Sequence, residues 1–297
     1  MNCKIAASIV LYNPDLDRLN ENIKSISMQV EKVILVDNAS DSTEIAKFEN
    51  SKCVLLRNQT NVGLAQALNQ AMQYAYEQGF DWVLTLDQDS VSQEDLVEGL
   101  KRHIDKERIG IIAPKFIDRN CPRLSDDDCG WKYVLRCITS ASLTNVKIWK
   151  TVGGFDNSLF IDYVDYAFCA KIIRNGFAII KDSDVSLLHE IGRSKRIFIF
   201  NKYSYILYNH SPMRDYYIVR NTLYYCYAYP DVWNVKQDKR ELILRCVMIL
   251  AFEKDKMAKF CSMLKGWKDS RKLIKVEKEK KREIRETVRQ EIKDKMK

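Results

Sequence analysis

The sequence has 297 residues, of which 46% are hydrophobic and 30% are charged, with only 10 glycines and 5 prolines. A chain of this length and composition is expected to fold around one large core, or one core with an appendage. Its nine cysteines include no C-x-x-C pair, which argues against a disulfide framework and fits a reducing cytoplasm. The longest strongly apolar stretch, residues 242–252, contains Arg245 and is far shorter than the roughly 20 residues that span a bilayer.

The formal net charge of +8 is concentrated at the C-terminus. Residues 268–297 contain 13 basic and 7 acidic residues, so the other 267 residues are almost neutral. A nucleic-acid-binding protein carries its positive charge on the folded face, so nucleic acid is excluded as the expected partner. A basic tail fits attraction to anionic lipid, and a solvated helix without a partner is the alternative.

The first ninety residues repeat a strand, a polar loop and a helix. Residues 4–11 form a β-branched run that ends at Tyr12-Asn13-Pro14, and apolar residues then recur at helical spacing through Ile26. Further strands are expected at 33–36, 53–56 and 82–86, each followed by a helical pattern. This alternation predicts an α/β fold with a mostly parallel central sheet covered by helices.

The pattern changes after residue 90. Ser92 and Asp95 resemble a capping box for the next helix. Strands are then expected at 109–113, 134–142, 178–181 and 185–188, with one helix at 163–175. Helices follow Asp215, including an amphipathic one from Leu242 to Leu264. We therefore expect a nucleotide-binding half at 1–90, an acceptor and catalytic half at 91–222, and a helical extension at 223–297.

Polar residues stand at the ends of the first four strands, where the open sheets of α/β proteins bind ligands. The nucleotide-binding candidates in this group are Tyr12, Asn13, Asp37, Asn61, Gly63 and Asp87. Asp37 is placed to accept a hydrogen bond from a ring N–H of a pyrimidine base, and a turn-capping Asp is the alternative. Asp87 and Asp89 are two residues apart, so their carboxylates can bind a ribose and a hard cation, Mg²⁺ or Mn²⁺.

Asp162 and Asp165 lie near the start of the helix expected at 163–175. That spacing places both carboxyls roughly on one helix face, where one of them can serve as a general base for a hydroxyl group. The alternative is two acids that only complement the helix dipole. Cys121, Cys129 and Cys137 recur every eight residues without a nearby His, and they are expected to be ordinary thiols and not a zinc set.

Four further residues are candidate contacts for metal, diphosphate or acceptor. His189 follows a strand-like run and is interpreted as a metal ligand or a donor to a diphosphate, with a core histidine as the alternative. Arg214, Arg220 and Asn221 lie in a polar and aromatic cluster. An arginine there is suited to bind phosphate or an acidic acceptor, and simple packing of the cluster is the alternative.

Taken together, the motifs resemble inverting family-two glycosyltransferases with a GT-A fold, in particular the rhamnosyltransferase branch. The matching stretches span residues 5–221 in the expected order: SIVLYNP, ILVDNAS, NVGLAQALNQA, LTLDQDS, GGFDNSLFIDYVDYAFC, LLHEIG and RDYYIVRN. The chain departs from many relatives at Val164, Ala167 and Lys171, where Glu, an acid and Arg are common.

The resemblance implies a role for each motif. Asp37 would hydrogen-bond the pyrimidine base, Asp87 would bind the ribose or the metal, and Asp89 would bind the metal. Asp165 would deprotonate the acceptor hydroxyl, while His189 would contact the diphosphate or the metal. The implied reaction is a single in-line displacement that transfers a sugar, L-rhamnose from dTDP-rhamnose, to a glycan or lipid-linked saccharide in cell-surface polysaccharide biosynthesis.

Two other classes of nucleotide-binding enzyme lack support in the sequence. The chain has no G-x-G-x-x-G, which disfavours a dehydrogenase, and no Gly-rich, Arg-containing loop after the first strand, which disfavours a nucleotidyltransferase. A transferase for another UDP- or dTDP-sugar and a binding module without turnover remain alternatives. The expected partners are a nucleotide-sugar donor and a saccharide or lipid-linked saccharide acceptor. For the C-terminal extension there are two alternatives. Its basic helix contacts the inner face of the cell membrane peripherally, or it forms a homodimer.

Overall fold

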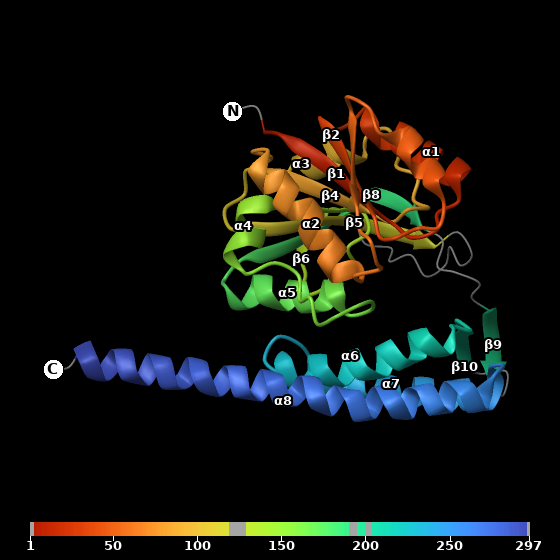
Figure 1. The fold of residues 1–297 in the computed structure, drawn as a ribbon, viewed down its shortest axis with the longest axis vertical. Helices are drawn as coiled ribbons and strands as arrows, with labels where there is room; N and C mark the ends of the chain where they lie inside the picture. Colours follow the sequence, from red (N-terminus) through yellow and green to blue (C-terminus); the bar gives the residue numbers. More distant parts are fainter. Residues whose placement is uncertain (1–2, 119–128, 190–194, 200–202, 296–297) are drawn as a thin grey trace. The chain divides into compact units, whose positions relative to one another are not determined.

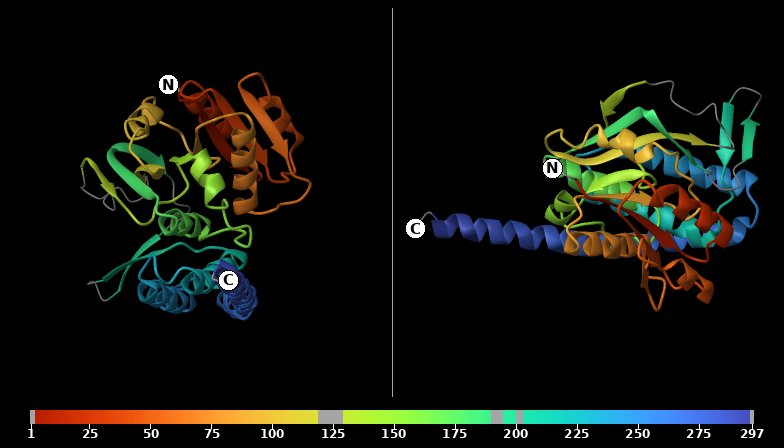
Figure 2. Two further views of the ribbon diagram at one scale, coloured as in Figure 1. Left: turned by 90° about the vertical axis from the view of Figure 1, so that its left-hand side faces the viewer. Right: turned by 90° about the horizontal axis from the view of Figure 1, so that it is seen from above.

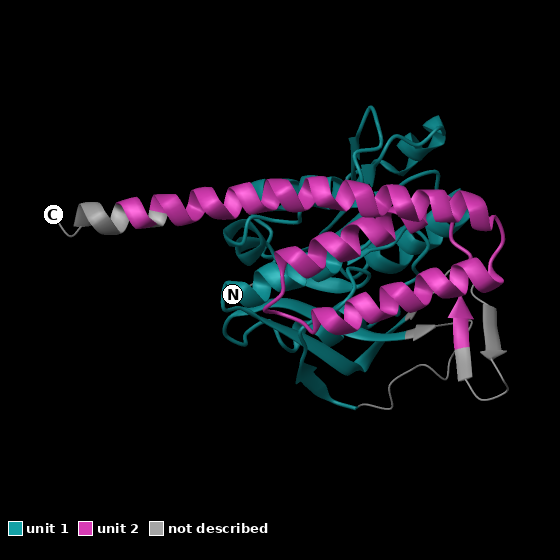
Figure 3. Ribbon diagram, turned by 90° about the horizontal axis from the view of Figure 1, so that it is seen from below, with its two compact units in different colours: residues 1–194 teal, residues 195–297 magenta. Residues whose placement is uncertain are grey.

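A computed structural model describes residues 3–118, 129–189, 195–199 and 203–295. The chain divides into two compact units, Met1–Ser194 and Lys195–Lys297 (Figure 3). The domain boundary proposed from the sequence, after residue 222, falls inside a helix of the second unit, Pro212–Ala228.

Unit 1 is built on an eight-stranded sheet with the order β3-β2-β1-β4-β7-β5-β8-β6. Its strands are β1 (Ile5–Leu11), β2 (Lys32–Asp37), β3 (Cys53–Arg57), β4 (Trp82–Leu86), β5 (Ile109–Asp118), β6 (Trp131–Tyr133), β7 (Ser142–Asn145) and β8 (Ala178–His189). Strands β3, β2, β1 and β4 are parallel, as are β5 and β8, whereas β7 and β6 run antiparallel to their neighbours. The prediction of a mostly parallel α/β sheet is therefore confirmed.

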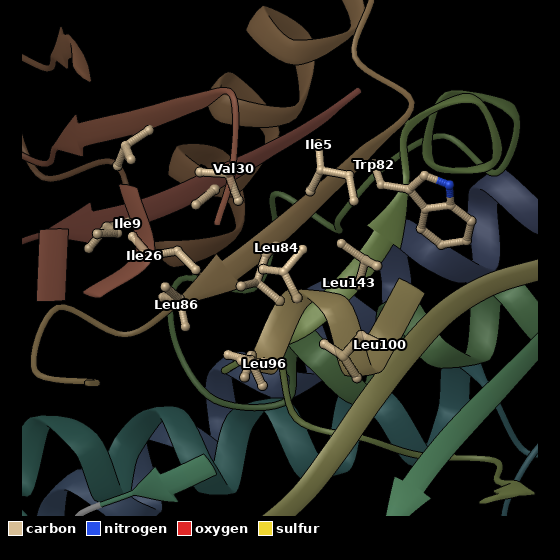
Figure 4. Packing of buried hydrophobic residues seen from close by; sticks show 14 of the residues in the cluster. Ile5, Ile9, Ile26, Val30, Trp82, Leu84, Leu86, Leu96, Leu100 and Leu143 are labelled. Atoms are coloured by element: carbon tan, nitrogen blue, oxygen red, sulfur yellow. The ribbon is translucent and has the colours of Figure 1, made fainter. Parts of the chain in front are cut away.

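Helices cover both faces of this sheet (Figures 1 and 2). They are α1 (Leu16–Ser27), the 3₁₀ helix η1 (Thr43–Phe48), α2 (Leu64–Glu77), α3 (Leu96–Lys101), α4 (Val146–Thr151) and α5 (Val164–Arg174). On one face, Ile5 and Ile9 of β1 pack with Ile26 of α1 and Leu100 of α3 in a continuous apolar cluster (Figure 4). Successive strand residues point to opposite faces, so the intervening residues of β1 face the other layer, which contains α2.

Three local predictions differ from the structure of unit 1. Residues 134–141 are not a strand, because the backbone turns where Ser142 N donates to Thr139 O (3.0 Å) and Thr85 Oγ1 donates to Ser142 O (3.1 Å). Ser92 and Asp95 form no capping box: the Asp95 side chain makes no cap hydrogen bond, and Ser92 N instead donates to Ser25 Oγ (3.1 Å). The strands expected at 178–181 and 185–188 are one strand, β8, whose pairing with β5 shifts register between them.

The described residues of unit 2 form a hairpin and three helices. The hairpin pairs β9 (Lys195–Ile199) with β10 (Tyr203–Leu207), and α6 (Pro212–Ala228), α7 (Val235–Phe252) and α8 (Lys256–Lys295) follow. Gly266 allows α8 to lie against α6, because a Cβ there would overlap the Tyr216 backbone. The single helix expected from Leu242 to Leu264 is two helices, broken where Asp255 adopts φ 54°. No helix within the described residues is long and apolar enough to cross a membrane.

Candidate active site

The sheet changes direction between β1 and β4. The chain runs from β1 outward to β2 and β3 and then returns to place β4 on the other side of β1. Ligands of open α/β sheets bind at the carboxyl ends of the strands at such a switch point. A cavity of about 120 Å³ lies there, and its lining includes Val10, Thr85, Asp87, Gln88 and Thr139. Two larger surface grooves are lined by other segments, one beside α1 and η1 and one beside α2 and α4.

The loop after β4 is held in place by two amide side chains that the sequence analysis did not single out. Gln88 Oε1 accepts from Tyr12 N (2.9 Å), and Gln88 Nε2 donates to Tyr12 O (3.4 Å). The buried Asn22 of α1 donates to Asp87 O (2.8 Å). These bonds fix the backbone of the loop, in which Asp87 is half-buried and Asp89 is exposed. A polar residue on the buried face of α1 was the sequence signal for Asn22.

Asp37 is the last residue of β2 and is almost fully buried. Its Oδ1 accepts from Ser40 N (3.0 Å), and its Oδ2 lies 3.6 Å from Arg57 Nε. Nearby, Asn13 Nδ2 donates to Asp41 Oδ2 (3.1 Å), which ties the end of β1 to the same turn. The turn-capping alternative for Asp37 is thus present in the structure, and its role toward a pyrimidine stays a prediction.

Asn61 and Gly63 belong to a rigid loop before α2. Asn61 Oδ1 accepts from Asn38 Nδ2 (2.8 Å) and from Gly63 N (3.0 Å). Gly63 has φ +86°, and a Cβ there would overlap both the side chain and the backbone of Phe160. Leu64 N donates to Phe160 O (2.6 Å). The start of α2 is therefore packed directly against the loop that leads to Asp162 and Asp165.

That second loop, residues 153–163, is fixed by two side chains. Asn69 Oδ1 accepts from Trp149 Nε1 (3.0 Å) and Phe155 N (2.8 Å), while its Nδ2 donates to Phe155 O (2.9 Å). Lys171 Nζ donates to Gly154 O (2.8 Å) and Gly153 O (3.2 Å). Lys171, one of the departures from many relatives, thus holds the loop from the side of α5.

Asp162 and Asp165 do not share a helix face, contrary to the prediction. Helix α5 begins at Val164, and Asp162 and Tyr163 precede it with φ 60° and 65°. The physical reason is that two successive residues in the left-handed region cannot continue a right-handed helix. Such backbone conformations persist where the surroundings hold them, and they concentrate at functional sites.

The Asp165 carboxyl has a strongly altered proton affinity. Burial raises its pKa from 3.8 to about 7, a hydrogen bond from Tyr166 N (2.8 Å) opposes the rise, and the negative charges of Asp162 and Asp87 add to it. The influence of Asp87 means that the end of β4 and the start of α5 converge. A carboxyl with a pKa near neutrality is suited to accept a proton from a hydroxyl group.

The segment 136–139 is a further part of this region that sequence reasoning missed. The Arg136 guanidinium lies 4.7 Å from the centre of the Tyr166 ring, and Cys137 Sγ lies 3.7 Å from Cys169 Sγ on α5. Cys137 therefore has a thiol partner from another element, Cys129 is exposed, and Cys121 lies outside the described residues. Cys129 and Cys137 are free thiols in the described part of the chain.

The remaining predicted site residues are His189 on β8 and three residues of α6. His189 is the last residue of β8, opposite Asp118, and its side chain lies outside the described residues. Arg214, Arg220 and Asn221 lie on α6 in unit 2. Arg220 Nε donates to the buried Asn221 (2.8 Å), and its guanidinium lies 4.8 Å from the centre of the Tyr217 ring. Their roles toward acceptor or diphosphate stay predictions.

The carboxylates at the end of β4 fit a divalent cation of the hard class. Within the described residues, no group of three or more His, Cys, Asp and Glu side chains gathers into a cage. Mg²⁺ usually binds through one or two carboxylates together with substrate phosphates. Asp87 lines the cavity at the switch point, and Asp89 follows two residues later. These two carboxylates match that requirement better than the tetrahedral requirement of zinc.

An open α/β sheet with polar residues at the carboxyl ends of its strands is typical of an enzyme that binds a nucleotide. The family model described as glycosyl transferase family 2 matches residues 7–129. The chain is 31% identical over 241 residues to the dTDP-rhamnosyl transferase RfbF of Shigella flexneri, covering 74% of this chain and 79% of that protein. The chain therefore belongs to the family 2 glycosyltransferases, and it is an enzyme of that class.

Solved structures share the fold. TarS 1–349 of S. aureus in complex with UDP-GlcNAc superposes with a TM-score of 0.57 at 17% identity, covering 91% of this chain and 81% of that one. GalNAc-T7 with UDP, GalNAc and Mn²⁺ superposes with a TM-score of 0.56 at 14% identity. The superposition covers 85% of this chain but only 58% of GalNAc-T7. At these identities the likeness concerns the fold alone.

Proposed function

We propose that this enzyme transfers L-rhamnose from dTDP-rhamnose, with inversion, to a glycan or lipid-linked saccharide in the biosynthesis of a cell-surface polysaccharide. The choice of sugar is supported by the 31% identity to a dTDP-rhamnosyl transferase. The single observation that carries the mechanism is the Asp165 carboxyl, whose pKa of about 7 reflects its burial and its nearness to Asp162 and Asp87.

In this mechanism Asp165 is the general base. Its carboxylate takes the proton from the acceptor hydroxyl while that oxygen forms a bond to the anomeric carbon. The bond from the anomeric carbon to the diphosphate oxygen breaks in the same step, and the nucleoside diphosphate leaves. One displacement from the opposite side inverts the anomeric configuration. A base with a pKa near the working pH is the most effective for this proton transfer.

The donor would lie along the carboxyl edge of β1, β2 and β4. The nucleoside contacts would come from Tyr12, Asn13, Asp37, Asn61, Gly63 and Asp87. Asp89, together with His189 and with Asp87 if it turns toward the diphosphate, would hold Mg²⁺ or Mn²⁺. A divalent cation, when bound, neutralises negative charge on the leaving diphosphate.

Asp162, Arg214, Arg220 and Asn221 would contact the acceptor or the diphosphate. We also propose that the enzyme works in the cytoplasm, with residues 1–222 as the catalytic domain and residues 223–297 as an extension. The extension would bring a basic helix to the inner face of the cell membrane, and a homodimer is the alternative use of this surface.

The test is turnover of purified full-length enzyme with dTDP-rhamnose, UDP-sugars and GDP-sugars, with Mn²⁺ or with EDTA. Thermal shift identifies the donor that binds, because a ligand specific for the native state raises the melting temperature. We expect release of dTDP from dTDP-rhamnose, by slow hydrolysis without acceptor, and an inverted product with a saccharide acceptor. Preference for a UDP-sugar or a retained anomer would contradict the proposal. Donor binding without any turnover would identify a module that lacks activity.

A further inference from the structure

Helices α7 and α8 both expose an apolar stripe beside the face that they bury. On α7, Ile243, Val247 and Leu250 follow one another at helical spacing and are 65%, 55% and 37% exposed. Leu242 and Ile249, on the other side of the same helix, are buried in the core of unit 2. The sequence pattern alone favoured burial of this segment in the chain's own core or in a dimer.

Helix α8 carries a second exposed apolar stripe. Met257, Phe260, Leu264 and Trp267 are separated by three or four residues, so they lie on one helix face, and all four are exposed. The buried residues of α8, including Lys259 and Met263, lie on the neighbouring face of the helix. Only residues 253–255 separate α7 from α8, and Phe252 and Met257 on either side of this turn are both exposed.

The turn between the helices is rigid. Lys259 Nζ lies 2.6 Å from Glu253 Oε2, and both side chains are buried. Asn209 holds the same pair, because its backbone N–H donates to Glu253 Oε1 (3.1 Å) and its Oδ1 accepts from Lys259 Nζ (3.1 Å). Removing a partner from a buried ion pair is strongly unfavourable, so a rotation of either helix that separated Lys259 from Glu253 would destabilise unit 2.

Basic side chains surround the stripe. They are Lys236, Lys239, Arg240, Lys254, Lys256, Lys265, Lys268, Arg271 and Lys272, all exposed. Among the acidic residues of this segment, Asp238 and Glu253 are buried and Asp269 pairs with Lys272 (2.8 Å). Glu241 and Asp255 are exposed, so basic side chains outnumber acidic ones on this surface. Arg271 lies 3.8 Å from the centre of the Trp267 ring, an amphipathic pair of the kind found at membrane interfaces.

We propose that the hairpin of α7 and α8 docks on an anionic lipid membrane, with the apolar stripe inserted at the headgroup boundary and the basic rim on the lipid phosphates. Neither helix is apolar enough to span a bilayer, and an apolar face rimmed by Lys and Arg is typical of a helix that lies in the interface. A two-fold dimer would bring the same patch of each copy together, and this basic rim would then face itself. The inference deepens the membrane contact proposed above and names the residues that make it.

The test is co-sedimentation of full-length protein with phosphatidylglycerol–phosphatidylcholine vesicles and with phosphatidylcholine vesicles alone. The double variant Val247→Ser/Leu250→Ser should lose at least about tenfold in binding to the anionic vesicles. Met28→Ser, which removes a side chain of unit 1 that is 88% exposed, should leave vesicle binding unchanged. Lys265→Glu/Lys268→Glu, which keeps the apolar stripe, should abolish the preference for anionic lipid.

Donor hydrolysis without vesicles separates this proposal from the proposed function. It should be equal in the wild type and in Val247→Ser/Leu250→Ser, which also reports that the variant is folded. Unchanged vesicle binding in the double variant would overturn the docking surface even if the enzyme turns over its donor. A wild-type dimer in light scattering that the same variant converts to a monomer would also overturn it.

Discussion

The carboxyl of Asp165 lies within electrostatic reach of Asp87, although one belongs to the first turn of α5 and the other follows β4. The charge of Asp87 adds to burial and to the charge of Asp162 in raising the pKa of Asp165. The group proposed as base and the loop proposed to bind the donor are thus parts of one electrostatic unit. Removing the charge of Asp87 should therefore lower the pKa of Asp165.

The first prediction concerns pH. Because the pKa of Asp165 is about 7, kcat/KM for the donor should rise with pH and level off above a midpoint near 7 in the free enzyme. Asp162→Asn removes a negative neighbour, which should move this midpoint to lower pH. A pH profile of donor turnover for both proteins measures the shift. A midpoint that is the same in the variant would mean that the observed limb belongs to another group.

The second prediction is that Asp165→Asn reduces transfer by about a hundredfold or more, the usual scale for a lost general base. Donor binding, measured by titration calorimetry, should be retained because the side chain keeps its size. Asp162→Asn is the matched control and should reduce transfer much less. The opposite order of the two variants would assign the base to Asp162.

Stability gives an independent readout of the same variant. The folded pKa of Asp165 lies above its ordinary value of 3.8, so the carboxyl stabilises the fold at low pH and this contribution is lost as the pH rises through about 7. Asp165→Asn cannot ionise. Its free energy of unfolding should exceed that of the wild type by as much as about 4 kcal/mol at pH 8 and should converge with it toward pH 4, as denaturant unfolding at both pH values will show.

The strands of the donor half could be predicted because their information is local. Runs such as residues 33–36 are β-branched and buried, and polar residues follow them directly. The contacts that hold the site together are not local. Asn22 supports the Asp87 backbone, and Arg136 lies over Tyr166, and neither pairing leaves a periodic trace in the sequence. The left-handed Asp162 was missed for a related reason, since its conformation is imposed by the packed loop before α5.

The third prediction is that nucleoside diphosphate binding depends on a divalent cation and that Asp89→Ala abolishes most of that dependence. Asp89 is exposed at the end of the β4 loop, so its removal should leave the fold intact. Calorimetric titration of dTDP or UDP with Mn²⁺ and with EDTA measures the difference. Equal affinity under the two conditions for the wild type would contradict the metal assignment.

The fourth prediction concerns Gly63, whose Cβ would overlap Phe160. Gly63→Ala should destabilise the fold by roughly 2 kcal/mol or more, because backbone strain at positive φ adds to the overlap, and donor binding should weaken as α2 shifts. Gly79→Ala is the matched control: Gly79 has φ +71° with open space around it, so it reports the backbone strain alone. Melting temperatures of the two variants separate the two contributions, and equal values would show that the contact with Phe160 is unimportant.

The last prediction concerns the distribution of charge along α8. Of the basic excess in residues 268–297, residues 283–297 contribute 5 basic and 4 acidic residues, so almost all of it lies before Glu283. The structure also makes Lys281 part of unit 2, since its Nζ donates to Ala228 O at the end of α6 (3.0 Å). A truncation from residue 270 would therefore remove contacts as well as charge, whereas a truncation after Arg282 should preserve the fold and donor binding.

We expect the chain truncated after Arg282 to bind anionic vesicles almost as well as the full chain. Lys278→Gln/Lys280→Gln/Arg282→Gln, which changes three exposed side chains of α8, should weaken that binding tenfold or more, because each basic residue near an anionic surface contributes roughly 1 kcal/mol. Raising the ionic strength should remove the difference between this variant and the wild type, since screening weakens exposed charges. If the truncation is the more harmful change, the end of α8 contacts the membrane or a second subunit through its apolar residues, and the charge before Glu283 is not what attracts the enzyme to lipid.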